Sequence, residues 1–453
     1  MRVYRFDGAG CAGFPADPLV GIPEGMPFLL DDAGVPVRVV NRWLRSLPTS
    51  GAPAPKTWVA YAGDVKAWVG FLEKRGVDVL DDRSVLREAV AAYHGERRMG
   101  PLAGRLDNSS WARAISSISS FYEWAESEGL IDGTPFSYRL QAIRGSDGAS
   151  RVVRRNLAAA RRAKRHVSVR WLEQDFLDLF VEVGLAGMLP DGGDDPAFRG
   201  REPARNAAAG ELAATSGLRA QEFSSLLVWE VPPPPPDEPP VVPLAVPGVI
   251  AKGGKSRSSW VSPRALRRLD SYLKLERPLS VAGCLWRPAG EALVVSEPDR
   301  LGGRVNGRRV RWDRVSLAER RRLVAPDGGP GLWALTAEGA PVEDWEYVFQ
   351  AASARCRRFE PRFPLVTPHM LRHSFAVHTL RWLTRTQLAM VAQLTGIWGA
   401  DPAWAMALRS QDPLMILRDL LGHASVSTTE VYLHLVDTAR LFTDGELGVV
   451  GDN

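Results

Sequence analysis

The residues best suited to chemistry lie near the C-terminus, in the stretch L-G-H-A-S-V-S-T-T-E-V-Y-L-H that runs from Leu421 to His434. His423 and Tyr432 are nine residues apart there, on either side of an expected tight corner. A histidine beside a tyrosine hydroxyl is a candidate nucleophilic site. Because most tyrosines on short helices only pack, the pair by itself leaves a structural role open.

Histidines also gather upstream of this pair, since five of the seven in the chain fall within 66 residues. His369 and Arg372 are three residues apart, so on a helix they share a face. A zinc site is disfavoured because no Cys, Asp or Glu joins the histidines at ligand spacing. Arginine grips phosphate oxygens, which makes phosphate handling the better interpretation. We expect His373, His378 and His434 to be structural.

Helix signals surround the corner and would hold these residues in place. Asp412 is expected to cap a helix, and Gly422 can take the left-handed conformation that ends it. Ser427 and Glu430 form a capping box, which predicts that a second helix starts at once and carries Tyr432.

From Val167 onward the pattern predicts a larger, mostly helical domain. An alanine-rich helix over 206–215 is followed by T-S-G-L-R, which places Arg219 just after its end. Strand-like runs at 246–251 and 256–261 flank the sequence K-G-G-K, and this arrangement predicts a β-hairpin with Lys252 and Lys255 at its turn. Thr367 is expected to cap the helix that carries H-M-L-R-H.

Two further segments of this domain stand out by composition. The prolines at 232–240 predict a stiff exposed loop. Nine arginines at 300–322 indicate either a surface for a phosphate backbone or a solvated helix face.

The N-terminal part of the chain predicts a separate small domain. Apolar and aromatic residues recur at spacings of three and four within 51–150, which indicates a helical bundle. Residues 1–50 are rich in Gly, Pro and Asp and predict an extension with little core of its own. Residues 151–166 are rich in arginine and lack acids, so they predict a basic linker that either tracks a phosphate backbone or is simply solvated.

Composition narrows the class of protein. The net charge of +5 and the pI near 9.2 are compatible with a nucleic-acid partner without proving one. The chain has 50 arginines and only seven lysines, so a position that keeps a lysine indicates that lysine itself is needed there. Three dispersed cysteines make neither a disulfide framework nor a zinc site, which predicts a reducing, cytoplasmic environment. No secretion signal or membrane-spanning run is visible.

Four motifs in order resemble those of tyrosine recombinases of the phage integrase family. G-L-R-A-Q-E-F is similar to the first arginine box, A-K-G-G-K to the lysine hairpin, H-M-L-R-H to the second box and L-G-H-A-S-V-S-T-T-E-V-Y to the third. The resemblance covers about residues 51–440. It carries over six catalytic positions: Arg219, Lys252, His369, Arg372, His423 and Tyr432.

The resemblance implies a mainly α (α+β) fold. It predicts a SAM-like, DNA-binding core-binding domain at 51–150, the basic linker at 151–166, a catalytic domain with a small antiparallel sheet at 167–445, and a tail at 446–453. The 381–412 segment, which lengthens the interval between Arg372 and His423, predicts an added helix or two.

The implied chemistry needs no cofactor, metal or ATP, because Tyr432 would attack the scissile phosphorus and store the bond energy as a 3′-phosphotyrosine. Arg219 and Arg372 would stabilise transition-state charge. His369 would act as general base or hydrogen-bonding partner, and His423 would donate to a non-bridging oxygen.

Lysine suits the role of general acid towards the departing 5′-hydroxyl, because arginine does not deprotonate. After residue 165 the chain keeps three lysines, and two of them lie in the predicted hairpin. Lys252 is the expected acid and Lys255 the alternative. Glu222 is expected to support an arginine through a charge-assisted hydrogen bond.

The implied partners are double-stranded DNA at a specific site and further copies of the chain, as a tetramer on paired sites. Thr438 to Leu447 would be exchanged between neighbours. The sequence leaves open an accessory DNA-bending or directionality factor, and it favours a phage or mobile-element role through its additional segments. The alternatives are a type IB topoisomerase-like relaxing enzyme or telomere resolvase, and an accessory DNA-binding protein without catalysis.

Overall fold

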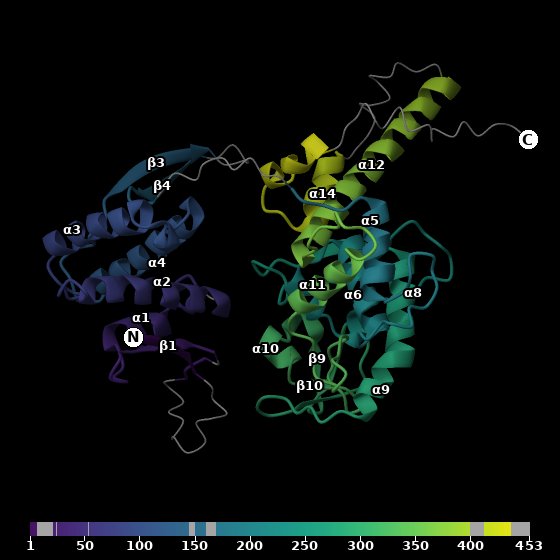
Figure 1. The fold of residues 1–453 in the computed structure, drawn as a ribbon, viewed down its shortest axis with the longest axis horizontal. Coiled ribbons are helices and arrows are strands. Elements are labelled where there is room, and N and C mark those ends of the chain that lie inside the picture. The colour runs from purple at the N-terminus through teal and green to yellow at the C-terminus, as the bar shows by residue number, and fades with distance from the viewer. Residues whose placement is uncertain are drawn as a thin grey trace, which may run out of the picture. The chain divides into compact units, whose positions relative to one another are not determined.

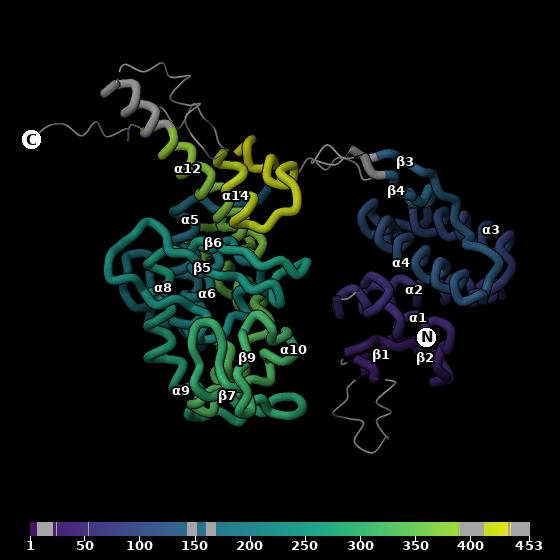
Figure 2. The backbone as a smooth tube through the Cα atoms, turned by 180° about the vertical axis from the view of Figure 1, so that it is seen from behind, coloured from purple at the N-terminus to yellow at the C-terminus, as the bar shows by residue number. Residues whose placement is uncertain are grey.

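The computed structural model describes residues 1–6, 21–23, 25–52, 54–144, 150–159, 169–398 and 412–435. The chain divides into two compact units, Met1–His166 and Val167–Asn453, whose elements are followed in Figures 1 and 2. The prediction of a mainly helical chain with small antiparallel sheets is confirmed. None of the described helices combines the length and apolar character needed to cross a membrane.

The first unit is a helical bundle with two small antiparallel sheets, β1–β2 and β3–β4. Aromatic side chains fill its core, where Trp68 Nε1 donates to the Tyr122 hydroxyl at 2.9 Å. Asp107 caps the helix that carries Tyr122 by accepting from Ser110 N. Its principal elements are β1 (Arg2–Arg5), β2 (Pro27–Leu30), α1 (Arg38–Ser46), α2 (Pro55–Glu73), α3 (Arg83–His94), α4 (Asn108–Ser127), β3 (Tyr138–Arg144) and β4 (Ser150–Asn156).

The N-terminal segment is not the core-poor extension that its composition predicts. Leu29 on β2 and Trp43 and Leu44 on α1 are fully buried in the same core as α2 and α4. Trp43 meets Phe121 edge to face, with the ring centroids 5.6 Å apart. The Gly, Pro and Asp content misled because these few large apolar side chains supply the buried area that decides packing.

Part of the predicted basic linker is a strand. β4 pairs with β3 so that Arg155 lies directly opposite Arg139 and Arg154 opposite Leu140. The Arg154 guanidinium stacks on the Tyr138 ring at 3.7 Å. The strand pairing was hidden from sequence reasoning because the arginines masked the β-branched Val152 and Val153 between them.

The second unit is built around α6, which is buried along most of its length. α8 and the π-helical segment η4 pack against α6, and α11 packs against η4. Its elements are α5 (Gln174–Asp178), η4 (Leu179–Leu185), α6 (Pro203–Ser216), α7 (Ala220–Ser224), η5 (Val228–Glu230), β5 (Val242–Val246), β6 (Arg257–Val261), α8 (Pro263–Ser271), η6 (Tyr272–Glu276), α9 (Arg277–Ala282), β7 (Leu293–Ser296), β8 (Gly302–Val305), β9 (Arg308–Arg311), η7 (Trp312–Arg314), α10 (Leu317–Arg320), β10 (Leu323–Val324), α11 (Glu346–Cys356), α12 (Pro368–Trp398), α14 (Pro413–Leu421), η8 (Val426–Thr428) and η9 (Glu430–Leu435).

The lysine hairpin forms, but its first strand comes earlier than predicted. β5 ends at Val246 because Pro247 has no N–H to continue the ladder. The next residues turn, and Ala251 N donates to Gly248 O at 3.0 Å. Residues 247–251, which were predicted as part of a strand, therefore belong to the connection between β5 and β6.

The arginine-rich stretch 300–322 is largely a hairpin rather than a helix face. β8 and β9 are joined through Asn306 and Gly307, both with positive φ (47° and 82°), as a tight hairpin turn requires. Arg304 pairs with Glu297 at 2.9 Å, and the fully buried Arg320 pairs with Glu230 at 2.6 Å. Several of these charges are thus neutralised within the protein.

A small cluster separate from the main core joins the C-terminal elements. Phe375 and Leu380 on α12 pack with Leu417 and Leu421 on α14, and Tyr432 on η9 belongs to the same cluster. α14 lies beside α12 in Figure 1. The apolar contacts of this cluster hold the C-terminal motif against the helix that carries H-M-L-R-H.

Candidate active site

A buried carboxylate organises the arginine side of the site. Glu222 is 0% exposed and accepts both guanidinium nitrogens of Arg257, at 3.0 and 2.6 Å. It also accepts from Arg219 Nη1 at 3.0 Å and from Arg219 N at 2.9 Å. Burial alone would raise the pKa of Glu222, but these hydrogen bonds and charges outweigh it and hold the pKa below its usual value. The expected support of an arginine by Glu222 is confirmed.

Arg257 links this carboxylate to the C-terminal motif. Its Nε donates to Leu420 O, in the last turn of α14, at 3.0 Å. Gly422, which ends α14 in the left-handed conformation as predicted, lies so close that an added Cβ would meet Arg257 Cδ at 2.9 Å. Only glycine satisfies both the positive φ and this close approach.

Arg372 is held by backbone carbonyls of two other motifs. It is 2% exposed, and its Nη1 donates to Gly217 O while its Nη2 donates to Leu421 O at 2.6 Å. Gly217 ends α6 just before Arg219, and Leu421 ends α14 just before His423. Arg372 therefore holds the first and third motifs in place, and the same two hydrogen bonds fix the position of its own charge.

The corner before Tyr432 differs from the predicted capping box. Two 3₁₀ turns, η8 and η9, replace the continuous helix, and Ser425 rather than Ser427 caps the first by accepting from Ser427 N at 3.2 Å. His423 Nδ1 lies 3.0 Å from the buried Thr429 Oγ1. The short turns arise because local hydrogen bonds of the Ser and Thr side chains compete with a full helix.

The Tyr432 hydroxyl faces His373. The residue is 2% exposed, and its Oη lies 2.7 Å from His373 Nδ1 on α12. The His369 and His373 rings meet edge to face, with centroids 4.3 Å apart. Burial raises the pKa of Tyr432 to about 12, while Arg372 and Arg219 act in the opposite direction.

The site is strongly cationic around neutral histidines. Burial lowers the pKa of His423 to about 4, and the charges of Arg372 and Arg219 add to this effect. His369 is only partly buried, and this partial burial, followed by the charges of Arg372, Arg219 and Lys252, lowers its pKa. Such a site favours a bound anion such as a phosphodiester.

The two hairpin lysines are both exposed in the connection between β5 and β6. Lys252 makes no hydrogen bond or ion pair with the described residues, but its charge acts on His369. No such effect of Lys255 on a site histidine is present among the described groups. The structure thus gathers Arg219, Arg372, His423 and Tyr432 closely, with His369 beside them and Lys252 on the exposed edge.

Sequence reasoning missed three residues of this site. His373 was expected to be structural, yet it contacts the candidate nucleophile. Arg257 gave no signal because arginine is common throughout this chain. Thr429 lies in the run S-T-T-E, where its hydroxyl could have been recognised as a partner for His423.

The remaining candidates lie apart from this site or beyond the described residues. His378 Nε2 lies 2.9 Å from Leu172 O and packs against Trp171, a structural role as expected. The side chain of His434, and the exchanged segment Thr438 to Leu447, lie outside what the structure describes. The segment 381–412 was predicted to add a helix or two, and α12 continues through it as far as Trp398. Residues 399–411 lie outside the part of the chain that the structure describes.

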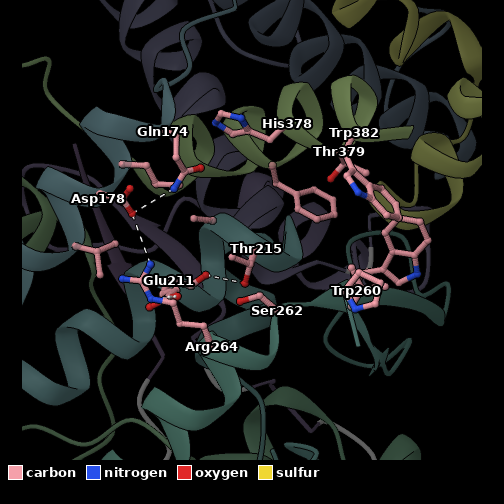
Figure 3. A pocket seen from close by; sticks show the side chains of 16 residues that line it. Gln174, Asp178, Glu211, Thr215, Trp260, Ser262, Arg264, His378, Thr379 and Trp382 are labelled. Carbon is pink, nitrogen blue, oxygen red and sulfur yellow. Dashed lines mark hydrogen bonds and ion pairs between the residues drawn. The ribbon is translucent and has the colours of Figure 1, made fainter. Parts of the chain in front are cut away.

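A cavity of about 250 Å³ lies between α5, α6, β6 and α12 (Figure 3). Trp260 and Trp382 meet edge to face on its wall, with His378 nearby. None of the six predicted catalytic residues lines it. Among the described residues, no three or more His, Cys, Asp and Glu side chains gather closely enough to hold a metal ion.

Comparison with known proteins agrees with the motifs. Residues 40–129 match the model of the phage integrase N-terminal SAM-like domain. The chain is 27% identical over 409 residues to tyrosine recombinase XerC of Nitrobacter winogradskyi, covering 89% of this chain and 90% of that protein. It is 27% identical over 384 residues to XerC of Mycobacterium tuberculosis, covering 84% and 88%.

Among solved structures, the XerH site-specific recombinase bound to a palindromic difH substrate aligns with a TM-score of 0.45 and 14% identity, covering 91% of this chain and 89% of that one. The sequence relatives and the SAM-like match define the class as tyrosine recombinases. The chain belongs to the tyrosine recombinase family and is a tyrosine site-specific recombinase.

Proposed function

We propose that the protein cleaves and rejoins duplex DNA at a specific site, with Tyr432 as the nucleophile that forms a 3′-phosphotyrosine. The observation that carries this proposal is that the charges of Arg372 and Arg219 act on both Tyr432 and His423, while the Tyr432 hydroxyl lies 2.7 Å from His373 Nδ1. Arg219 and Arg372 would stabilise the negative charge that develops on the phosphate oxygens. The Thr429 hydroxyl would donate to His423 Nδ1, so that the neutral ring carries its hydrogen on Nε2 and can donate to a non-bridging oxygen.

The phenol is buried beside His373 in this structure, so the site must open to the scissile phosphate, with the contact between Oη and His373 Nδ1 kept, before Oη can attack. We propose that this opening accompanies assembly on DNA as a tetramer, with the segment Thr438 to Leu447 contributed to a neighbouring copy. Integration or excision of a mobile element is the proposed role, which makes the DNA that flanks the gene the first place to look for the site.

The test of the proposed function is covalent trapping. The purified protein is mixed with nicked suicide duplexes that tile the DNA flanking its own gene, without ATP and with a metal chelator. We expect an adduct that survives denaturation, and peptide mapping should place the phosphotyrosine at Tyr432. Relaxation of supercoiled DNA without site preference would favour the topoisomerase-like alternative, and salt-sensitive binding without any adduct would favour the accessory protein.

The general acid is predicted to be Lys252 rather than Lys255. Lys252→Ala should slow adduct formation about 100-fold or more, whereas Lys255→Ala should change it less than about threefold. A 5′-bridging phosphorothiolate substrate, whose sulfur leaves without a proton, should restore the rate of Lys252→Ala. Equal losses for both lysine variants, or no rescue by sulfur, would contradict this assignment.

The β3–β4 hairpin is predicted to contact the DNA backbone. Arg139 and Arg155 lie directly opposite each other, and neither makes an ion pair with the described residues. Like charges opposite each other destabilise a sheet unless an anion lies between or beside them. Replacing both by alanine should weaken binding to every duplex alike and lower the salt slope by about two. Arg45→Ala, which removes an exposed charge from α1, is the control and should leave the salt slope unchanged in fluorescence anisotropy titrations.

A further inference from the structure

The Tyr432 hydroxyl has one hydrogen-bond partner among the described residues, and it is not the histidine expected to act as base. His373 Nδ1 lies 2.7 Å from Oη, the distance of a short, well-formed hydrogen bond. His369, the expected base, contacts the His373 ring instead and is itself exposed. The candidate nucleophile is thus already joined to a ring nitrogen able to take its proton.

We propose that His373 is the catalytic residue that accepts the phenolic proton of Tyr432 during DNA cleavage, an inference that rests on the proposed function. The neutral ring must then carry its hydrogen on Nε2, so that the lone pair of Nδ1 faces Oη. Proximity of this kind is the first requirement of a general base.

The step balances as a phosphoryl transfer. As the Oη–phosphorus bond forms, the Oη–H bond breaks and the proton passes to Nδ1, which turns His373 into an imidazolium. The bond from phosphorus to the 5′-oxygen breaks, and that oxygen takes its proton from the general acid. On rejoining, the 5′-hydroxyl attacks phosphorus and returns its proton to the general acid, while the Oη–phosphorus bond breaks and Tyr432 Oη takes its proton back from His373.

The surroundings of His373 suit a neutral acceptor. His369 and Arg372 flank it on α12, Tyr432 faces it from η9, and His423 lies near it after α14. Arg219 acts on the same phenol from the start of α7. Burial, then His369 and Arg372, lower the pKa of His373 to about 4, so the ring is neutral and able to accept throughout the neutral range.

With His373 as the base, His369 takes the second role expected for it, that of a hydrogen-bonding partner. Its exposed ring lies at the cationic edge of the site near Lys252, where it can hydrogen-bond a bound phosphate. His373, in contrast, has no described partner besides Tyr432 within hydrogen-bonding distance.

The test compares two replacements of His373 in the full chain. His373→Asn places an amide oxygen near the former Nδ1 position and retains an acceptor for the phenol, but it cannot take up a proton. His373→Gln also removes the ring, but its longer side chain does not hold the amide oxygen at the former Nδ1 position. Single-turnover adduct formation is measured on the suicide duplex that wild type cleaves, with DNA affinity and thermal unfolding recorded for each variant.

Both variants are expected to form adduct about 100-fold or more slowly than wild type while binding DNA with similar affinity. The 5′-bridging phosphorothiolate substrate should not rescue them, because it replaces the acid and not the base. On that substrate the wild-type rate should be nearly flat from about pH 6 to pH 9, since His373 is already neutral there. The variant rates should rise about tenfold per pH unit, because the buried phenol, with its pKa of about 12, must then ionise into solvent.

Three outcomes would overturn the proposal. One is a His373→Asn rate within about threefold of wild type, which would show that His373 contributes a hydrogen bond to the phenol and does not accept its proton. Another is a rate loss with the wild-type pH profile, which would assign a purely structural role. The third is full rescue of either variant by the sulfur leaving group. Failure of wild type to form any adduct would instead refute the proposed function itself.

Discussion

Replacing Tyr432 by phenylalanine is expected to abolish the covalent adduct with DNA, a loss of about 10⁴-fold or more. The change deletes one oxygen and keeps the ring that packs with Phe375, Leu417 and Leu421. DNA affinity should therefore stay within about twofold of wild type. Stability should fall only by the cost of leaving His373 Nδ1 without its partner, about 1–3 kcal/mol.

The measurement is a denaturing gel of the suicide-duplex reaction, with binding followed in parallel by gel shift. Tyr347→Phe is the matched control, because this tyrosine is 76% exposed on α11 and lies outside the site. An adduct that persists in Tyr432→Phe would show that another side chain is the nucleophile, and the assignment of the third box would then be wrong.

Replacing Glu222 by leucine is expected to produce the largest loss of stability, about 3–5 kcal/mol in the free energy of unfolding. The carboxylate is fully buried and holds Arg257 and Arg219 together. Its removal leaves the nearly buried Arg257 charge without a counterion. Adduct formation should fall as well, because Arg219 loses the bond that orients its guanidinium and α14 loses the alignment that Arg257 imposes through Leu420.

Urea denaturation followed by tryptophan fluorescence measures this effect, with Glu222→Gln as the isosteric variant. Glu338 forms an ion pair with Arg201 in which both side chains are well exposed, at 69% and 78%, so Glu338→Gln is the surface control and should cost less than about 1 kcal/mol. A loss for Glu222→Gln no larger than that of the control would refute the structural role of this carboxylate.

The spacing of residues along single helices was enough to predict much of the site. His369 and Arg372 share a helix that begins at Pro368, and Gly422 takes the left-handed conformation that its place after Leu421 predicts. Asp412 caps α14 by accepting from Leu414 N at 2.8 Å. These features could be predicted because capping, glycine conformation and the 3.6-residue period depend on neighbours in the chain.

Local patterns failed where packing outweighed them. The capping box at Ser427 and Glu430 gave way to 3₁₀ turns, and the strand predicted at 246–251 turned at Pro247. The N-terminal segment joined the helical core through Leu29, Trp43 and Leu44. Local hydrogen bonds of Ser and Thr side chains decided the first case, a proline that blocks the ladder decided the second, and contacts distant in sequence decided the third.

By itself the sequence determined the class of protein, the chemistry expected of it and the motifs that supply Arg219, Arg372, His423 and Tyr432. Only the tertiary structure decided which side chains touch inside the site. It brought Arg257 to Glu222 across 35 residues and His373 to Tyr432 across 59. Hydrogen bonds between residues so far apart leave no periodic trace in the sequence, because their geometry is set by how β6 packs against α7 and how η9 packs against α12 in the folded chain.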